Sequence, residues 1–236
     1  MTLWTLGLTF LSTVLLAVGS PVLPRDVIPH DEVVGFPETV PDTRIGQLYL
    51  KYKPHLYVAN GCVPFPAVDA EGNTSGGLKP TGSPSGDCSK STGQVYARAA
   101  SFNNAFAIMY AWYMPKDEPI TGIGHRHDWE GIVVWIDDPN KDEPTLLGVA
   151  ASAHGGFATE TSPAVDGTSP LIEYVSFFPL DHQLTFTSTE GGEQPLIAYE
   201  SLTDAARNAL ENTDFGDANV PFKNANFENN LVKAEL

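Results

Sequence analysis

The sequence contains few basic residues for its length. Lys and Arg total 13 of 236 residues against 29 Asp and Glu, which gives a formal net charge of −16 at pH 7. No basic cluster is available to neutralise phosphates, so the composition argues against nucleic-acid binding. The same negative charge is repelled by anionic lipid surfaces, so general charge attraction would not recruit the protein to a membrane. A divalent cation could still bridge acidic side chains to anionic or sugar-bearing head groups.

Several motifs that mark common enzyme and cofactor classes are also missing. We find no internal repeat, no glycine-rich phosphate loop, no C-x-x-C pair and no H-E-x-x-H pair. After the N-terminal region, no segment is apolar enough to span a bilayer. The chain does contain 42% hydrophobic and 10% aromatic residues, which argues against disorder of the whole chain. Its 21 glycines and 19 prolines favour turns and short strands over long helices.

Only two cysteines occur, Cys62 and Cys88, and they flank a segment rich in Gly, Ser and Pro. In a secreted protein two cysteines have one possible intramolecular pairing, so a Cys62–Cys88 disulfide is predicted. The alternative is a pair of buried free thiols. The same segment contains Asn73 in an Asn-Thr-Ser sequence, which is a possible N-glycosylation site.

The N-terminus has the features of a secretory signal peptide. Residues 1–19 contain no Lys or Arg, carry an apolar run over residues 3–18 and end in small residues before Pro21. The alternative is a membrane anchor, for which the run is short. We therefore expect cleavage near residue 19, an extracellular protein, and a single domain over residues 20–236. Residues 20–40 are proline-rich without periodicity and suggest a short leader or propeptide-like segment.

The remaining pattern is mainly one of strands. Apolar, aromatic and alternating runs predict strands at 55–58, 94–98, 105–114, 131–136 and 146–153, with a weaker one at 184–188. Helical spacing is confined to residues 201–210 and 224–233 near the C-terminus. We predict an α+β protein, mainly a β-sandwich with peripheral helices. The tryptophans of the strand-like runs are expected in its core: Trp112, Trp129 and Trp135.

The most charged short segment is GHRHDWE, residues 124–130, between a predicted turn and the strand at 131–136. Side chains alternate faces in extended chain, so Asp128 and Glu130 share a face while Trp129 points the other way into the core. His125 is expected in the preceding loop, where it can fold over that face.

Asp117 approaches the same rim if the two flanking strands pair, which brings three carboxylates and an imidazole together. Such a cluster is unfavourable without a cation, because neighbouring carboxylates raise one another's pKa. Oxygen-rich ligands favour Mg²⁺, Ca²⁺ or Mn²⁺ over Zn²⁺. The alternative is a solvated charged turn at the start of a strand.

Longer motifs point to a known family. The run AIMYAWYMPKD at 107–117, followed by GHRHDWE, resembles the signature of the necrosis- and ethylene-inducing-peptide-like proteins. Further matches are NGCVPFPAVD at 60–69, GNTSGGL at 72–78 and GQVYAR at 93–98. The resemblance covers about residues 30–235, and the two-cysteine pattern is similar to the type 1 branch.

The resemblance implies a fold, a site and a partner. The fold would be a β-sandwich similar to the pore-forming actinoporins and fungal lectins. Family members are secreted and damage plasma membranes, typically of eudicot plants, by binding the sugar head groups of glycosylinositol phosphorylceramides. A divalent cation, Mg²⁺ or Ca²⁺, would lie in a cavity at the top of the sandwich. The implied cation ligands are Asp117, His125, Asp128 and Glu130, and the implied supporting residues are Asp181 and His182.

Arg126 and His127 could orient the loop or contact the ligand, and the sequence does not separate these roles. The leading hypothesis is a secreted cytolysin without catalytic turnover, and so not an enzyme. One alternative is a metal-dependent hydrolase, in which the ion activates water. Another is a non-toxic lectin-like binder or immune elicitor, because the segment 107–130 resembles a peptide that plant immune receptors recognise.

Overall fold

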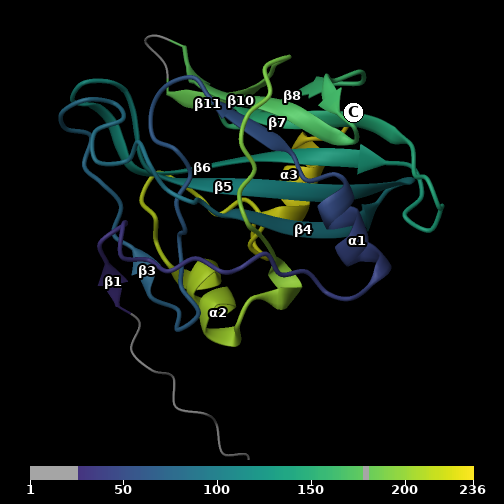
Figure 1. The fold of residues 1–236 in the computed structure, drawn as a ribbon, viewed down its shortest axis with the longest axis horizontal. Helices are drawn as coiled ribbons and strands as arrows, with labels where there is room; N and C mark the ends of the chain where they lie inside the picture. Colours follow the sequence, from purple (N-terminus) through teal and green to yellow (C-terminus); the bar gives the residue numbers. More distant parts are fainter. Residues whose placement is uncertain (1–25, 178–180) are drawn as a thin grey trace, which may run out of the picture.

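The computed structural model describes residues 26–177 and 181–236 (Figure 1). The predicted signal peptide over residues 1–19 lies outside the described residues. Within them, two β-sheets face one another and short helices lie at the periphery. The predicted α+β β-sandwich is therefore confirmed. The expected likeness to actinoporins and fungal lectins stays a prediction.

The larger sheet contains the longest strands of the described chain. In spatial order its strands are β12 (Leu196–Ala198), β4 (Val95–Phe102), β5 (Ala105–Ile120), β6 (Ile123–Ile136), β7 (Leu146–Ala153) and β8 (Gly156–Glu160). From β4 to β8 each strand is antiparallel to the next, and β12 pairs with β4 in parallel. The hairpin of β5 and β6 forms the centre of this sheet.

The smaller sheet packs against one face of the larger one. Its strands are β11 (His182–Phe186), β10 (Ser169–Ser176) and β2 (His55–Val58), and β9 (Val165–Asp166) also pairs with β10. A short parallel pair of β1 (Val27–Ile28) and β3 (Thr74–Ser75) lies apart from both sheets. Contacts of β11 with β6 and β7 join the two sheets near the end that carries the charged residues.

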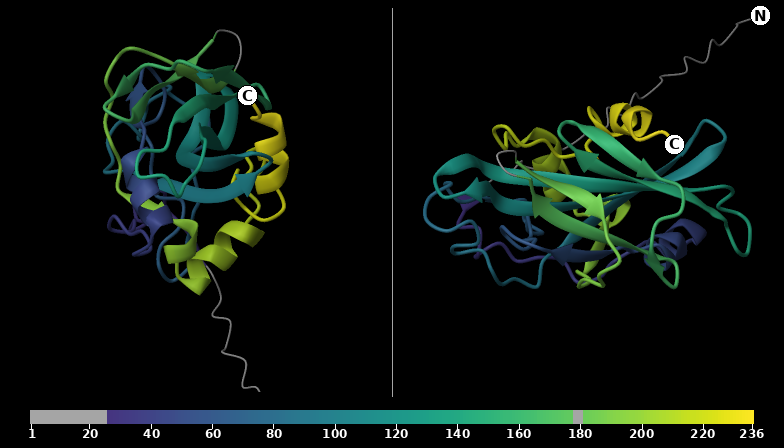
Figure 2. Two further views of the ribbon diagram at one scale, coloured as in Figure 1. Left: turned by 90° about the vertical axis from the view of Figure 1, so that its right-hand side faces the viewer. Right: turned by 90° about the horizontal axis from the view of Figure 1, so that it is seen from above.

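The helices of the described chain are short, and two of them start at a threonine cap. They are α1 (Arg44–Lys51), α2 (Asp204–Asn212) and α3 (Phe227–Lys233), with a 3-10 turn over Tyr199–Ser201. The Thr43 and Thr203 side chains accept hydrogen bonds from the first-turn amides of α1 and α2. Figure 2 shows α3 in yellow and the smaller sheet in green on opposite sides of the larger sheet.

Buried side chains form one hydrophobic cluster that reaches both faces of the larger sheet. On one face, the Tyr110 hydroxyl donates to the Tyr49 carbonyl in α1 (2.8 Å). On the other, Trp135 Nε1 donates to the carbonyl of Ala234 at the end of α3 (2.8 Å). These bonds satisfy polar atoms that would be costly to bury alone. The tryptophans predicted to be core are all buried: Trp112, Trp129 and Trp135.

Most strand predictions hold, but helix α1 and strand β10 were not predicted, and the bounds of the central hairpin differ from the expectation. Strand β5 continues past Met114 to Ile120, and β6 starts at Ile123, so His125 lies in a strand rather than in the predicted loop. Pro115 does not end β5 because it lies at an irregularity of the register, where it has no partner residue on β6. Its carbonyl accepts from the Leu78 amide instead (2.7 Å).

The proline-rich residues before α1 also differ from the expectation of a leader or propeptide-like segment. From residue 26 they pack onto the body of the protein. Val33 is buried, and the Phe36 amide donates to Gln94 Oε1 (2.7 Å). This segment shows no periodicity because isolated contacts hold it rather than a regular element.

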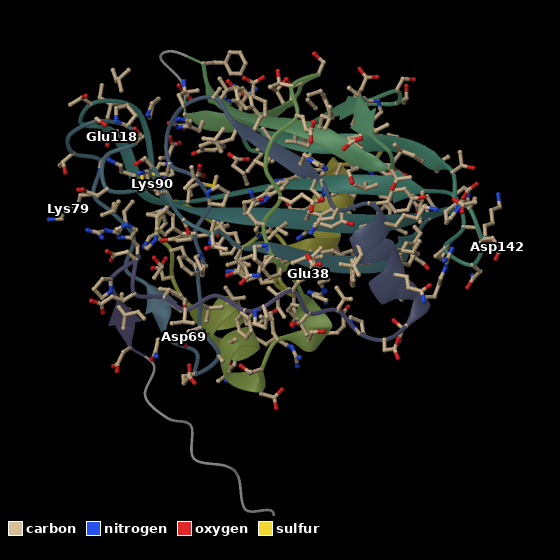
Figure 3. All side chains as sticks on the ribbon, viewed as in Figure 1. Glu38, Asp69, Lys79, Lys90, Glu118 and Asp142 are labelled. Atoms are coloured by element: carbon tan, nitrogen blue, oxygen red, sulfur yellow. A yellow bond between two sulfur atoms is a disulfide. The ribbon has the colours of Figure 1, made fainter. Side chains whose placement is uncertain are left out.

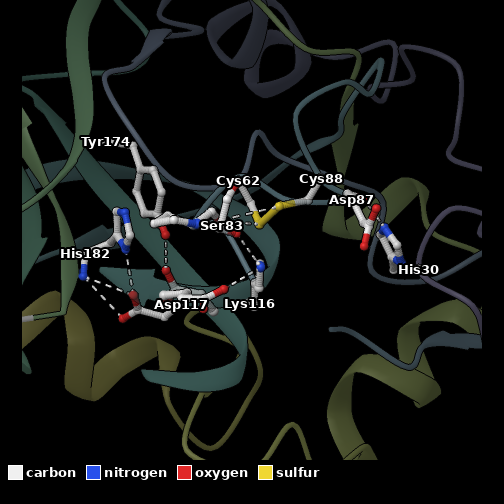
Figure 4. Close-up of a disulfide and its surroundings, with 12 residues drawn as sticks. His30, Cys62, Ser83, Asp87, Cys88, Lys116, Asp117, Tyr174 and His182 are labelled. Carbon is white, nitrogen blue, oxygen red and sulfur yellow. Dashed lines mark hydrogen bonds and ion pairs between the residues drawn. A yellow bond between two sulfur atoms is a disulfide. The ribbon is translucent and has the colours of Figure 1, made fainter. Parts of the chain in front are cut away.

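The predicted disulfide joins Cys62 and Cys88 and is confirmed (Figure 4). A buried ion pair holds the disulfide-closed segment against β5. Lys116 Nζ lies 2.5 Å from Glu118 Oε2 and donates to the Ser83 carbonyl (2.9 Å). Figure 3 shows Glu118 at the end of the molecule that also carries exposed lysines.

Asn73 lies within the same segment, and its side chain is already engaged. It is half-buried, its Oδ1 accepts from the Asp26 amide (3.2 Å) and its Nδ2 donates to Asp69 Oδ2 (2.9 Å). Glycosylation at Asn73 stays a prediction.

We expect removal of the disulfide to lower the free energy of unfolding substantially. The bridge closes a segment with a sequence separation of 26 residues. In the chain-entropy model such a loop stabilises the folded state by about 3 kcal/mol. The Cys62→Ala, Cys88→Ala double variant should lose about this amount in urea denaturation without reductant. Equal stability of the variant and the parent would contradict the expectation.

Candidate metal and ligand site

A cavity of about 460 Å³ opens at the end of the sandwich where β5, β6 and β11 meet. The β7–β8 turn and the C-terminal segment around residues 217–233 complete its wall. All residues predicted as cation ligands, together with the Asp-His pair, line this cavity: Asp117, His125, Asp128, Glu130, Asp181 and His182. The β5–β6 hairpin and the distant segment at the start of β11 are therefore brought to one place.

Asp117 is the most connected residue of the site. It is 1% exposed, so it does not lie at an exposed rim as its position near a turn suggested. The His182 amide donates to both of its oxygens, and His182 Nδ1 donates to Oδ1 (2.6 Å; Figure 4). His125 Nε2 lies 3.7 Å from Oδ2. Hydrogen bonds to a carboxylate fix its orientation and favour its charged form.

A bulge in β6 gives His125 its place in the cavity. In a regular strand His125 and Asp128, three residues apart, would point to opposite faces. Here Arg126 and His127 both pair with Lys116, and His127 has a positive φ of 63°. This extra residue changes the alternation, so His125 and Asp128 both line the cavity.

The tautomer of His125 suits a metal ligand. Its Nδ1 donates to the His127 carbonyl (2.8 Å), which leaves Nε2, 3.7 Å from Asp117 Oδ2, as the ring nitrogen that an ion could bind. Metal-binding histidines commonly hold one ring nitrogen in this way while the other binds the ion.

Asp128 and Glu130 share a face, as predicted from alternation, and each has a partner on a different strand. Tyr174 on β10 donates its hydroxyl hydrogen to Asp128 Oδ2 (2.7 Å). Ser152 on β7 donates its hydroxyl hydrogen to Glu130 Oε2. Trp129 packs on the opposite face, as expected. Sequence reasoning missed Tyr174 and Ser152, because nothing local distinguishes them from other strand residues.

The titratable groups of the site have strongly shifted pKa values. Burial, and then the charge of Asp117, raise the pKa of Asp128 to about 7. Burial and the charge of Asp128 raise the pKa of Glu130 well above its ordinary value. For His125, burial lowers the pKa, but the bond to the His127 carbonyl and the charges of Asp128 and Asp117 raise it by more. The cluster thus holds protons near neutral pH unless another cation replaces them.

The tightest group of candidate ligands includes Asp181. Ligand atoms of Asp117, His125 and Asp181 lie within 4.8 Å of one another, a spacing that could hold a metal ion. Asp128 and Glu130 line the same cavity, and one oxygen of each carboxylate accepts a hydrogen bond from a hydroxyl group. The structure therefore places Asp181, inferred as a supporting residue, beside two of the predicted ligands.

Arg126 and His127 do not line the cavity. Arg126 Nη1 donates to the carbonyls of Gly76 (2.5 Å) and Gly77 (3.0 Å). His127 Nδ1 lies 2.6 Å from the Tyr113 hydroxyl, and burial lowers its pKa to about 4. Their contacts are those of residues that orient the strand against the disulfide-closed segment.

Gly61 sets the position of His182. Its φ is +84°, and a Cβ at this residue would lie 2.5 Å from His182 Nε2. The His182 ring is also stacked on Tyr174, with centroids 4.6 Å apart. The ring is thus confined between backbone and an aromatic face, which fixes the nitrogen that binds Asp117.

The family profile described as "Necrosis inducing protein (NPP1)" matches residues 46–234. The chain belongs to the necrosis-inducing protein family. The family inferred from the sequence motifs is therefore confirmed.

Relatives within the necrosis-inducing protein family include proteins of two Phytophthora species. The chain is 54% identical to "NLP effector protein 1" of Phytophthora capsici over 215 residues, which cover 88% of this chain and 91% of that protein. It is 51% identical to "Necrosis-inducing protein NPP1" of Phytophthora nicotianae over 227 residues, covering 93% and 94%. These relatives are named as effectors and necrosis-inducing proteins.

Solved structures of the family share the fold of this chain. NLPPya in complex with mannosamine has a TM-score of 0.85 and 50% identity, over 89% of this chain and 99% of that one. The non-toxic HaNLP3 protein has a TM-score of 0.84 and 45% identity, over 87% and 98%. Among the described residues of our chain, the helices are all too short or too polar to cross a membrane.

Proposed function

We propose that the protein is a secreted cytolytic toxin that binds glycosylated sphingolipid head groups of plant plasma membranes through a divalent cation. Binding then disrupts the membrane and induces necrosis and immune responses. The observation that carries this proposal is the group of Asp117, His125 and Asp181 at the cavity, in a chain of the necrosis-inducing family. Secretion is proposed from the signal-peptide pattern over residues 1–19, with residues 20–236 as the mature domain.

The donor set fits a hard divalent cation, Mg²⁺ or Ca²⁺. Carboxylate oxygens outnumber the single imidazole, and burial followed by the charge of neighbouring acids raises the pKa values of Asp128 and Glu130, so a cation in the cavity would offset an unfavourable charge. Asp117, His125 and Asp181 would hold the ion, with Asp128 and Glu130 binding it directly or through water. When bound, the cation would offset the carboxylate charge and attract the hydroxyl oxygens of a sugar.

Sugar recognition is supported by relatives. Structures of NLPPya have been solved with mannosamine and with glucosamine, at TM-scores of 0.85 and 0.84 to this chain. The polar wall of the cavity offers the donors and acceptors that hydroxyl groups require. The charge of −16 disfavours attraction to anionic lipid, so the head group itself is proposed to provide the recognition.

A vesicle-leakage experiment tests the proposal. Vesicles containing glycosylated plant sphingolipid should leak, and vesicles of simple anionic phospholipid should stay intact. A chelator should prevent leakage, and so should His125→Ala or Asp128→Ala. Lysis of plain anionic vesicles in chelator would refute the recognition step, and leakage unaffected by either substitution would refute the site.

A second candidate is a non-cytotoxic sugar binder or immune elicitor. It is favoured by HaNLP3, a non-toxic protein that shares this fold at 45% identity. Cation-dependent binding to the same vesicles without leakage would select it. Immune recognition of the segment 107–130 would require prior unfolding or proteolysis, because residues 107–118 are buried in β5.

A further inference from the structure

The cavity continues beyond the acidic group onto the other face of the larger sheet. Strand β7 pairs with β6 only from Ile132 onward, so the preceding edge of β6 is open on that side among the described residues. The cavity passes this edge and reaches the C-terminal segment. We call its first part, around Asp117 and His125, the acidic lobe. We call the second part the C-terminal lobe; it is formed by Trp129, Phe157, Asp217, Asn219 and Lys233.

The C-terminal lobe has a fixed base and exposed polar side chains. Asn226 Nδ2 donates to the Val220 carbonyl (2.9 Å), and Asn230 Nδ2 donates to the Pro221 carbonyl (2.9 Å), so these amides hold the backbone. In contrast, the side chains of Asp217, Asn219 and Lys233 are exposed. These three together supply donors and acceptors of the kind that bind sugar hydroxyls.

Lys233 spans the lobe and the β7–β8 turn. Its Nζ donates to the Gly155 carbonyl (3.2 Å), which leaves two further donors on the ammonium group. Phe157, on β8, lines the same part of the cavity and is half-buried, so it presents apolar ring surface beside the polar groups. An apolar face next to a few polar groups is the usual composition of a small-ligand site.

Trp129 provides an independent observation. It is 7% exposed and lines the cavity, and its Nε1 has no hydrogen-bond partner among the described residues. Buried indole N–H groups usually have a partner, so this donor requires an explanation. Nε1 itself is fully buried, so a ligand hydroxyl oxygen in the C-terminal lobe would accept its hydrogen only after a shift of the indole toward the lobe.

The size of the cavity supports a ligand larger than a hydrated ion. Each water molecule occupies about 30 Å³, so a cation with a few waters would leave most of the 460 Å³ unfilled. The volume lies within the range of about 300 to 1,000 Å³ typical of sites for organic ligands.

We propose that the C-terminal lobe binds the second hexose unit of a saccharide whose first unit lies in the acidic lobe. The preferred ligand is then a disaccharide or longer glycan rather than a single sugar. This inference rests on the proposed cation-dependent sugar binding and adds the length of glycan that the site recognises. Lys233 further favours a second unit that carries no positive charge.

Isothermal titration calorimetry of the mature protein in excess Ca²⁺ tests the inference. The probes are glucosamine and glucosaminyl-glucose disaccharides with 1→4 and 1→6 linkages. At least one disaccharide should bind about tenfold more tightly than glucosamine, as expected for added hydrogen bonds and ring contact. In NMR spectra, the indole N–H resonance of Trp129 should shift when that disaccharide is added and should not shift with glucosamine.

Substitutions locate the effect. The Asn219→Ala, Lys233→Ala double variant should lose the tenfold advantage, while Asn229→Ala, on the same helix but outside the cavity, should retain it. Disaccharides that bind no more tightly than glucosamine, or an advantage that survives the double variant, would overturn the second subsite and leave the proposed function standing. If glucosamine itself fails to bind with Ca²⁺ present, the proposed function fails, and the inference fails with it.

Discussion

Replacing Asp117 with asparagine is expected to weaken Ca²⁺- or Mg²⁺-dependent binding to sphingolipid vesicles by at least about a hundredfold. Loss of a residue that only supports a metal ligand typically costs ten- to a hundredfold in affinity, and Asp117 is proposed to bind the ion itself. Asp117 also orients His182 and faces His125, so one substitution removes the negative charge that both imidazoles face. Glu130→Ala should act in the same direction.

Asparagine is the suitable replacement because Asp117 is buried. Its Oδ1 can still accept from the His182 amide and from Nδ1, so the local hydrogen bonds survive and the fold should stay intact. Asp42→Asn, an exposed acid outside the cavity, is the matched control for the loss of one negative charge. Calorimetry with each ion, followed by vesicle binding, gives the measurement. Parent-like ion and lipid binding by Asp117→Asn would show that the ligand is placed wrongly.

The cation-free protein should lose stability as the pH rises through about 7. The pKa of Asp128 is about 7 in the folded state against an ordinary value of 3.8, so the folded state binds more protons between these values. The stabilisation is therefore complete below about pH 4 and is lost as the pH rises through 7. A shift of this size corresponds to up to about 4 kcal/mol. Glu130, whose pKa is also raised, acts in the same direction.

His127 acts in the opposite direction and must be separated from this effect. Its pKa of about 4 means that its contribution to stability is lost as the pH falls from about 6.5 to 4. Comparison of the parent with Asp128→Asn isolates the carboxyl group, because Asn keeps an acceptor for Tyr174. Urea denaturation in chelator should give the variant the larger free energy of unfolding at pH 8 and a similar one at pH 5. Saturating Ca²⁺ should remove the deficit of the parent, and a constant difference at both pH values would contradict the assignment.

The central hairpin illustrates how far sequence patterns predict this site. Alternation alone places Asp128 and Glu130 on one face and Trp129 on the other, because the period of a strand is fixed. Pairing of the two flanking strands was enough to bring Asp117 to the same end. These inferences need only local geometry and one antiparallel contact, and both are present.

The remaining parts of the site depend on contacts that no local pattern specifies. Asp181 and His182 reach the cavity because β11 packs against β6 and β7 from the second sheet. The partners of the acids, Tyr174 and Ser152, come from two further strands. Extension of β5 through Pro115 required knowledge of the register, since proline normally ends such a strand.

The bulge at Arg126 and His127 makes the length of the β6 segment as important as its residue types. Deletion of either residue would remove the bulge and leave His125 two residues before Asp128, so the two side chains would still share a face. One inserted residue would instead turn His125 to the face that Trp129 occupies, away from Asp117. Evolution can therefore exchange side chains in this stretch more readily than it can add a residue between His125 and Asp128. Natural sequences that keep the acids but have one more residue there should have lost the cation site.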